Sequence, residues 1–303
     1  MNKKIIPAFS ILFLLYVQSF SQGCSDAGFC TMGSLKSSMA DGTPYKHRVK
    51  LLFGFGSGEQ KTKHVDVIPE FEFSFFEYNV LQIKVPFLVV DGNLGSNNGL
   101  GDVSISTSQA FLVTDQSQLG VTIGAKLPTG TTNAKALPMP YQTGLGTVDL
   151  ILGVSYQYNK WKFSTGYQKI LSDGNKNHFL HTTNSTEQEL KYFESNLLAR
   201  GDDALIRVDR SFNPGKIKLT AGLLSIFRLQ KDRITNEMNQ QVALEGSDGL
   251  TLNVTGGAEF LLSDQSGVNL LFGMPAVVRD VRADGLTRKF VFFASYHFRF
   301  GKK

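Results

Sequence analysis

The chain has 303 residues, of which 42% are hydrophobic and 19% are charged, and its formal net charge is +5. A disordered chain would carry more charge and few aromatic side chains, whereas this one has 24 Phe and 9 Tyr. Outside the N-terminus no run of about 18 apolar residues occurs, which excludes a helical membrane protein. The Lys and Arg residues are scattered singly, so we expect no nucleic-acid partner.

The N-terminus has the features of a secretory signal peptide. Lys3 and Lys4 precede an apolar stretch over residues 5–17, and small residues flank Phe20 at the expected cleavage site. We therefore expect residues 1–21 to be removed on export; a buried helix is the alternative, which Pro7 disfavours. Residues 22–47 have no clear period and would form a periplasmic tail or a plug.

Two cysteines, Cys24 and Cys30, follow this cleavage site. In an exported, oxidising segment they are candidates for a local disulfide. Lipidation of Cys24 is the alternative, although the usual upstream Leu is missing. Two cysteines are too few for a disulfide-built scaffold.

From Arg48 onward, apolar side chains recur at every second position in a series of stretches. A period of two predicts β-strands with one apolar face and one polar or small face. We expect twelve strands near residues 48–58, 64–76, 80–90, 102–112, 118–128, 146–158, 160–170, 203–213, 216–228, 249–261, 266–276 and 288–300.

The connections between these stretches alternate in length from the second one onward. The short ones are residues 77–79, 113–117, 159, 213–215 and 262–265, and the long ones are residues 91–101, 129–145, 171–202, 229–248 and 277–287. Outer-membrane barrels have short periplasmic turns and longer external loops. A soluble β-sandwich has no reason to sort its loops in this way.

Strand length agrees with a membrane barrel, because a tilted strand crosses a bilayer in ~9–11 residues. No sheet edge can face lipid, so the sheet must close. We predict an all-β fold: an antiparallel, transmembrane, up-and-down β-barrel of about twelve strands over residues 48–300, in the outer membrane. The alternative is a pair of sheets whose Phe-bearing faces meet in a dry core.

If the Phe-rich face meets lipid, the polar face lines the lumen. Its candidates are Lys50, Asp66, Glu70, Glu72, Lys84, Asp102, Lys126, Asp149, Arg207, Asp209, Lys218, Arg228, Glu259, His297 and Arg299. Centring the second hairpin on Tyr78 places Glu72 opposite Lys84. Such pairs are typical of a structural network, with a selectivity filter as the alternative. Twelve strands imply a lumen narrower than that of a wide porin.

Three prolines lie toward the outer ends of predicted strands. Pro86, Pro128 and Pro275 each remove one hydrogen-bond donor from a sheet. Strand ends at a rim tolerate this loss. We therefore interpret all three as structural residues of the outer rim.

Three glycine-rich motifs connect the chain with a known family. Residues 98–102 read Asn-Gly-Leu-Gly-Asp, residues 125–130 read Ala-Lys-Leu-Pro-Thr-Gly, and residues 143–147 read Thr-Gly-Leu-Gly-Thr. These motifs resemble the outer-membrane barrel family named for the MetA pathway of phenol degradation, over about 51–300 in layout and 98–158 in motif. The resemblance implies a β-barrel that passes small hydrophobic or aromatic compounds, distantly like fatty-acid channels.

Catalytic motifs are missing from the sequence. It has no Gly-x-Ser-x-Gly, no His-Glu-x-x-His and no phosphate-binding loop. Of five histidines, His297 is expected to face inward and His64 is a candidate for the same face, while His178 and His181 are a solvated loop pair. We expect no enzyme activity, no metal and no cofactor.

Three functions remain, of which a passive channel for small, including hydrophobic or aromatic, solutes is favoured. A structural or adhesive barrel is the second, with residues 171–202 as a partner-binding loop, and an outer-membrane hydrolase is the third. The expected partners are the lipid bilayer of the outer membrane, a small-molecule solute and the barrel-assembly machinery.

Overall fold

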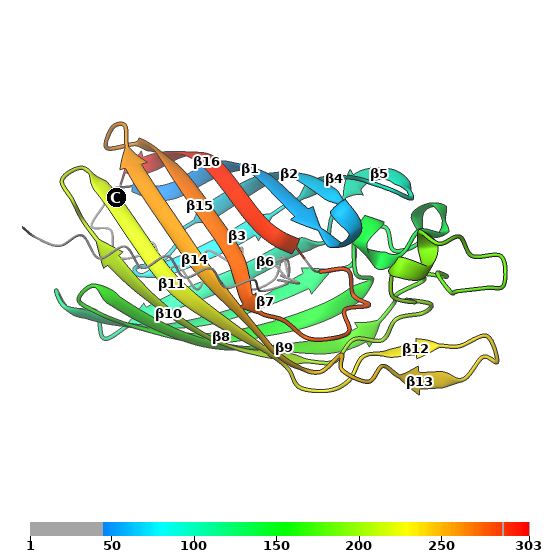
Figure 1. Ribbon diagram of the computed structural model, residues 1–303. Coiled ribbons are helices and arrows are strands. Elements are labelled where there is room, and N and C mark those ends of the chain that lie inside the picture. The colour runs from blue at the N-terminus through cyan, green and yellow to red at the C-terminus, as the bar shows by residue number, and fades with distance from the viewer. Residues whose placement is uncertain (1–44, 287, 303) are drawn as a thin grey trace, which may run out of the picture.

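The computed structural model describes residues 45–286 and 288–302 of the chain. In this part, twelve antiparallel strands form one ring that closes because β1 pairs with both β2 and β16 (Figure 1). The order around the ring is β1-β16-β15-β14-β11-β10-β9-β8-β7-β6-β3-β2. The strands are β1 (Tyr45–Gly58), β2 (Lys63–Phe73), β3 (Asn79–Lys84), β6 (Val103–Phe111), β7 (Ser117–Leu127), β8 (Thr147–Tyr158), β9 (Trp161–Asp173), β10 (Asp203–Phe212), β11 (Ile217–Arg228), β14 (Gly249–Leu261), β15 (Ser266–Val277) and β16 (Arg288–Lys302).

The apolar side chains of these strands lie on the outside of the ring. Phe53, Ile123, Phe163 and Tyr296 are all exposed, with fractions of 40% or more. In a dry core between two sheets the same side chains would be buried. The predicted barrel is therefore confirmed, and the sandwich alternative is wrong.

The two ends of the barrel differ as the loop lengths predicted. Turns at residues 74–78, 112–116, 159–160, 213–216 and 262–265 lie at one end, with the C-terminus. The long loops gather at the other end, at the right of Figure 1. They carry a small hairpin of β12 (Arg233–Thr235) and β13 (Gln241–Ala243) and short 3-10 turns at η3 (Ala134–Ala136), η4 (Met139–Tyr141) and η5 (Glu189–Lys191). The loop that joins β1 to β2, with η2 (Glu59–Lys61), also lies at this end and is short.

The third predicted strand is interrupted at Pro86, which corrects its assignment to the rim. β3 ends at Lys84, and the chain resumes as β4 (Phe87–Gly92), which pairs with the outer half of β2. β4 then turns into β5 (Gly95–Leu100), so most of residues 91–101 form a hairpin rather than a long loop. A proline has no N–H to continue the ladder, and it therefore separates the two segments.

The other two prolines lie near the ends of their strands. Pro128 follows the last residue of β7, while Pro275 lies inside β15 opposite Asn253. The pairing register shifts directly beside this pair, between Leu252 and Asn253. The hydrogen bond that Pro275 cannot donate is thus missing at a position where the pairing of β14 and β15 is already irregular.

The predicted register of the second hairpin is wrong by two residues. Glu72 faces Gln82, and Lys84 faces Glu70. The turn spans residues 74–78, with Tyr78 in the left-handed region at φ 57°, and the N–H of Asn79 donates to the carbonyl of Phe76. The hairpin is therefore centred on Glu77, because the loop starts earlier than the sequence indicated.

Some predictions fall outside the described residues. The signal peptide and the pair Cys24 and Cys30 belong to the part of the chain that is not described. β1 begins at Tyr45, so residues 45–47 lie in the first strand rather than in the N-terminal segment. No helix in the described part is long and apolar enough to cross a membrane.

Candidate functional site: the barrel lumen

The inward-facing side of the strands carries the charged residues of the barrel. Twelve of the lumen candidates are buried, namely Asp66, Glu70, Glu72, Lys84, Asp102, Lys126, Asp149, Arg207, Asp209, Arg228, His297 and Arg299. Lys50 and Glu259 are half-buried. Lys218 is exposed, but it lines the open part of the lumen.

An ionic network joins the first three strands of the ring. Glu70 of β2 accepts hydrogen bonds from Lys50 of β1 at 2.6 Å and lies 3.3 Å from the ammonium of Lys84 in β3. Arg48 donates to Glu72 at 2.8 Å. The pairing register places these groups next to one another across adjacent strands. The network therefore ties together the part of the wall where β2 and β3 share only a short ladder.

Similar pairs stabilise other parts of the wall. The ammonium of Lys126 in β7 lies 2.6 Å from Asp149 in β8. Arg207 donates two hydrogen bonds to Asp209, at 2.7 and 2.9 Å, and Arg299 lies 3.8 Å from Glu259. Most of these charges are thus paired within the wall, although Arg207, Asp209 and Glu259 also line a cavity of the lumen.

A second ionic cluster closes the outer end of the barrel. Arg228, at the end of β11, donates to Asp203 at 2.7 Å and to Asp284 at 3.0 Å, and it also bonds Asp232. Arg279 donates to Asp284 at 3.0 Å. All five side chains are buried. The cluster thus joins two outer loops to the ends of β10 and β11.

The charge of Asp284 is strongly stabilised by this cluster. Burial by itself raises the pKa of a carboxyl group. The guanidinium groups of Arg279, Arg228 and Arg200 outweigh that effect and hold the pKa of Asp284 well below its ordinary value of 3.8. The carboxylate therefore stays ionised to a lower pH than an ordinary aspartate.

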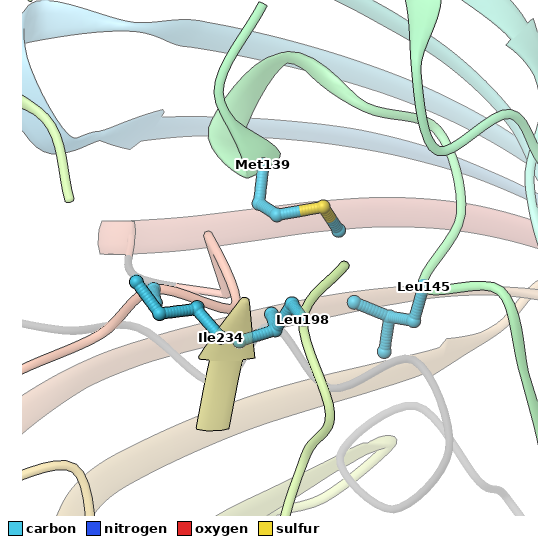
Figure 2. Packing of buried hydrophobic residues seen from close by; sticks show 5 residues of the cluster. Met139, Leu145, Leu198 and Ile234 are labelled. Carbon is cyan, nitrogen blue, oxygen red and sulfur yellow. The ribbon is translucent and has the colours of Figure 1, made fainter. Parts of the chain in front are cut away.

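Apolar side chains from the same loops pack beside the ionic cluster. Met139, Leu145, Leu198 and Ile234 gather in one buried group (Figure 2), together with Ala283. Gly285, at φ 67°, lies so close to the backbone of Met139 that a Cβ atom would collide with it. We call this ionic and apolar assembly the outer cap.

Two cavities lie along the lumen. The inner cavity, of about 340 Å³, extends toward the periplasmic turns and includes Asn159 and Asn213 in its lining. The outer cavity, of about 90 Å³, lies beneath the outer cap and is lined in part by Met139 and Leu145. Phe293 of β16 lines both cavities. Its ring therefore stands at the boundary between them.

One wall of the lumen is apolar. Leu52, Ile68, Val291 and Phe293 form a buried cluster on β1, β2 and β16, and Leu271 of β15 packs against it. The inner cavity is lined by Leu52, Leu271 and Val291. The outer cavity is lined by Ile68, and Phe293 lines both cavities. We call these five residues the apolar wall.

Charged residues lie across the lumen from the apolar wall. β9 is six positions from β1 in either direction around the ring, which places it on the opposite side. On this side, the inner cavity is lined by Lys162 of β9 and by Arg207, Asp209 and Lys218 of the next two strands. Arg48, Lys50 and Glu70 of β1 and β2 line the same cavity, so charged side chains lie on both sides of the lumen and the apolar wall interrupts them on one side.

The apolar wall was not among the predictions from the sequence, because every inward position was expected to be polar or small. A signal was present in pairs of adjacent apolar residues that interrupt the alternation. One side chain points outward and one inward in each of the pairs Leu51-Leu52, Leu271-Phe272 and Phe292-Phe293. Such pairs mark positions where an apolar residue lines the lumen.

The five histidines lie in different parts of the barrel and its loops. Within residues 45–286 and 288–302, no group of three His, Cys, Asp or Glu side chains is placed to hold a metal ion. A ring nitrogen of His178 is 3.2 Å from Asn196, and one of His181 is 3.0 Å from the carbonyl of Tyr192. Both rings thus take part in the packing of their loop, while His64 and His297 are buried on the inside of the barrel.

A closed antiparallel barrel with an apolar exterior, an ionic interior and loops sorted by length is an outer-membrane β-barrel. The family model described as "Putative MetA-pathway of phenol degradation" matches residues 61–193, which confirms the family resemblance seen in the sequence motifs. No curated protein matches the sequence.

Two solved structures share the fold. An outer membrane channel from Pseudomonas putida F1 is 14% identical, with a TM-score of 0.58 over 84% of this chain and 96% of the other. The NanC porin is 6% identical, with a TM-score of 0.51 over 83% of this chain and 100% of the other. At these identities the comparisons establish the architecture.

Proposed function

We propose that this protein is an outer-membrane channel for the passive diffusion of small solutes that combine an apolar body with a polar group. The observation that carries the proposal is an apolar wall inside a lumen that is otherwise lined by charged side chains. The apolar wall borders both cavities, while charged side chains line the inner cavity both beside the wall and across from it. A solute with an apolar part and a polar part contacts both kinds of surface favourably.

The dimensions of the lumen support a limit on solute size. The inner cavity has about 340 Å³, and the outer one beneath the outer cap has about 90 Å³. A dry protein cavity of about 150 Å³ accommodates benzene. A molecule with a single ring therefore fits the inner cavity and has to widen the outer one, and a larger solute such as an oligosaccharide would require the outer cap to move.

The comparisons support the same proposal at a coarser level. The two solved structures are described as a channel and a porin, and neither description names an enzyme. The matching family model is described by a pathway that degrades an aromatic compound. We extend these descriptions to this chain by proposing aromatic or similarly compact apolar solutes, with export by a signal peptide and insertion by the barrel-assembly machinery.

Planar-bilayer recording of the purified full chain tests the proposal. We expect single-channel currents in KCl, and we expect phenol on either side to reduce them in a concentration-dependent way. Phe298→Leu, which changes a lipid-facing residue of β16, is the control for general effects on the barrel. A folded barrel that carries no current, even after shortening of the outer loops, would contradict the proposal and favour a structural or adhesive role.

A further inference from the structure

The outer cavity combines apolar side chains, polar side chains that have partners, and one buried imidazole that has none among the described residues. We propose that it is a binding site for an uncharged, ring-sized molecule that bears one hydroxyl or carbonyl group, and that His64 recognises this group. The inference deepens the proposed function and rests on it for the route by which the solute arrives. It assigns the specificity of the route to one residue of the barrel wall.

Half of the side chains that line the cavity are apolar. Ile68 and Phe293 come from the apolar wall, and the remaining ones come from the interrupted third strand and the outer loops, namely Pro86, Leu88, Met139, Pro140, Leu145 and Leu286. A volume of about 90 Å³ is smaller than the roughly 150 Å³ in which a protein binds benzene, so a ring-sized solute has to widen the cavity when it binds. The apolar half of the lining suits the body of such a solute.

The charged side chains of the lining have partners. Asp66 accepts a hydrogen bond from Arg288 at 2.7 Å, and Lys126 lies 2.6 Å from Asp149. Asp284 is held by the arginines of the outer cap. A charged solute would have to compete with these pairs in a buried place, which is costly. This argues for an uncharged solute.

The uncharged polar groups and the remaining carboxylate are also engaged. Asp102 accepts hydrogen bonds from the N–H groups of Gly130, at 3.1 Å, and Leu145, at 2.8 Å. The hydroxyl of Thr143 accepts one from the N–H of Thr131 at 2.9 Å. The amide of Gln142 donates to Leu137 at 2.7 Å. These groups hold the loop of η4 in place.

His64 is the exception among the polar side chains of this lining. It is 4% exposed, and neither of its ring nitrogens has a hydrogen-bond partner among the described residues. The ring lies in β2, with Gly56 and Val90 as its neighbours across the sheet. Buried polar groups without partners are rare in native structures and call for an explanation.

The chemistry of a neutral imidazole defines the group that it would bind. One ring nitrogen donates a hydrogen bond and the other accepts one. A hydroxyl group can engage either nitrogen, and a carbonyl group can accept from the protonated one. A site built to hydrogen-bond one substituent discriminates strongly against the analogue that lacks it, because the buried group is then left unpaired.

The test uses the full-length protein, labelled with ¹⁵N in its histidine rings and held in detergent micelles at neutral pH. Phenol and cyclohexanone are added as probes, and fluorobenzene is the matched probe that lacks the oxygen. The His64 signals are identified by their loss in His64→Gln. We expect phenol and cyclohexanone, but not fluorobenzene, to shift the ring signals of His64.

Two variants connect this contact with affinity. His64→Leu removes the hydrogen bond and should weaken phenol binding by roughly 2- to 10-fold, the usual range for one hydrogen bond. His64→Gln restores a donor and an acceptor and should recover part of the affinity. His297→Gln is the matched control, because His297 is also buried inside the barrel but lines neither cavity. Migration on gels without heating shows whether each variant is folded.

The outcomes separate this inference from the proposed function. Phenol that binds without disturbing the His64 signals, or equal shifts with fluorobenzene, overturns the role of His64. No binding of any probe to the folded protein overturns the site itself. Binding at His64 in a barrel that carries no current supports the site and contradicts the channel.

Discussion

The ring of Phe293 in β16 covers Gly54, its pairing partner in β1, so closely that a side chain at position 54 would collide with the ring. The glycine thus lets an aromatic residue lie against the barrel wall at the boundary of the two cavities. A glycine usually weakens a strand, and such a position often marks a close approach. Here the approaching group is the residue that separates the two cavities.

Replacement of either residue should change the passage between the cavities. In Phe293→Ala, the two cavities should merge and the single-channel conductance should rise. In Gly54→Val, the added side chain should push the ring into the lumen and lower the conductance. Recording both variants beside the unmodified protein tests this, and a change in the same direction for both would contradict it.

The outer cap should depend on Asp284. Asp284→Asn removes a negative charge that neutralises Arg228 and Arg279 inside the protein. Breaking a buried ion pair in this way lowers the stability by about 3–5 kcal/mol. We expect faster proteolysis of the outer loops and a higher conductance, with the barrel itself intact on unheated gels. The control is Glu245→Gln, which removes the partner of Lys231 in an exposed pair and should cost about 0–1 kcal/mol.

The cap should also resist acid. The pKa of Asp284 lies below its ordinary value of 3.8 because three arginines surround it, so its contribution to stability is complete above that value. This contribution is lost only as the pH falls further, through the lowered pKa of the folded state. The conductance should therefore be constant from neutral pH down to a pH equal to the ordinary pKa of aspartate. It should rise only in stronger acid. Asp284→Asn should abolish this dependence, and a transition near neutral pH would contradict it.

The inner cavity should favour anions. Its lining contains six basic residues, Arg48, Lys50, Lys160, Lys162, Arg207 and Lys218, and three acidic ones, Glu70, Asp209 and Glu259. Lys218→Glu should shift the reversal potential in a KCl gradient toward cation selectivity. Lys46→Glu changes an exposed lysine outside the lining and should have little effect. Equal shifts in the two variants would show that the selectivity is set elsewhere.

The barrel could be predicted from the sequence because lipid imposes a strict chemical rule on one face of every strand. Phe290, Phe292, Tyr296 and Phe298 recur at every second position, and this pattern is sufficient to assign the strand and its outward side. The sorting of short turns to one end and long loops to the other followed from the two chemically different ends of a membrane barrel. Both signals are local, so they could be read without knowing which strands are neighbours.

The lumen was predictable only in part, because its contacts depend on register and on loops from distant parts of the chain. The sequence indicated that Glu70, Glu72 and Lys84 share one face, but the turn around Glu77 decided which of them meet. Pro86 was expected at a rim, yet pairing with β2 on both sides made it a break within the wall.

The sequence by itself determined the alternation that turns apolar side chains to the membrane, and with it the class of the fold. Only the tertiary structure decided that Leu52, Phe293 and their neighbours form an apolar wall, and that His64 lies in a cavity without a hydrogen-bond partner among the described residues. The reason is physical: exposure to lipid acts on each residue separately. The surroundings of an inward side chain are instead supplied by other strands and loops, whose positions exist only once the barrel has closed.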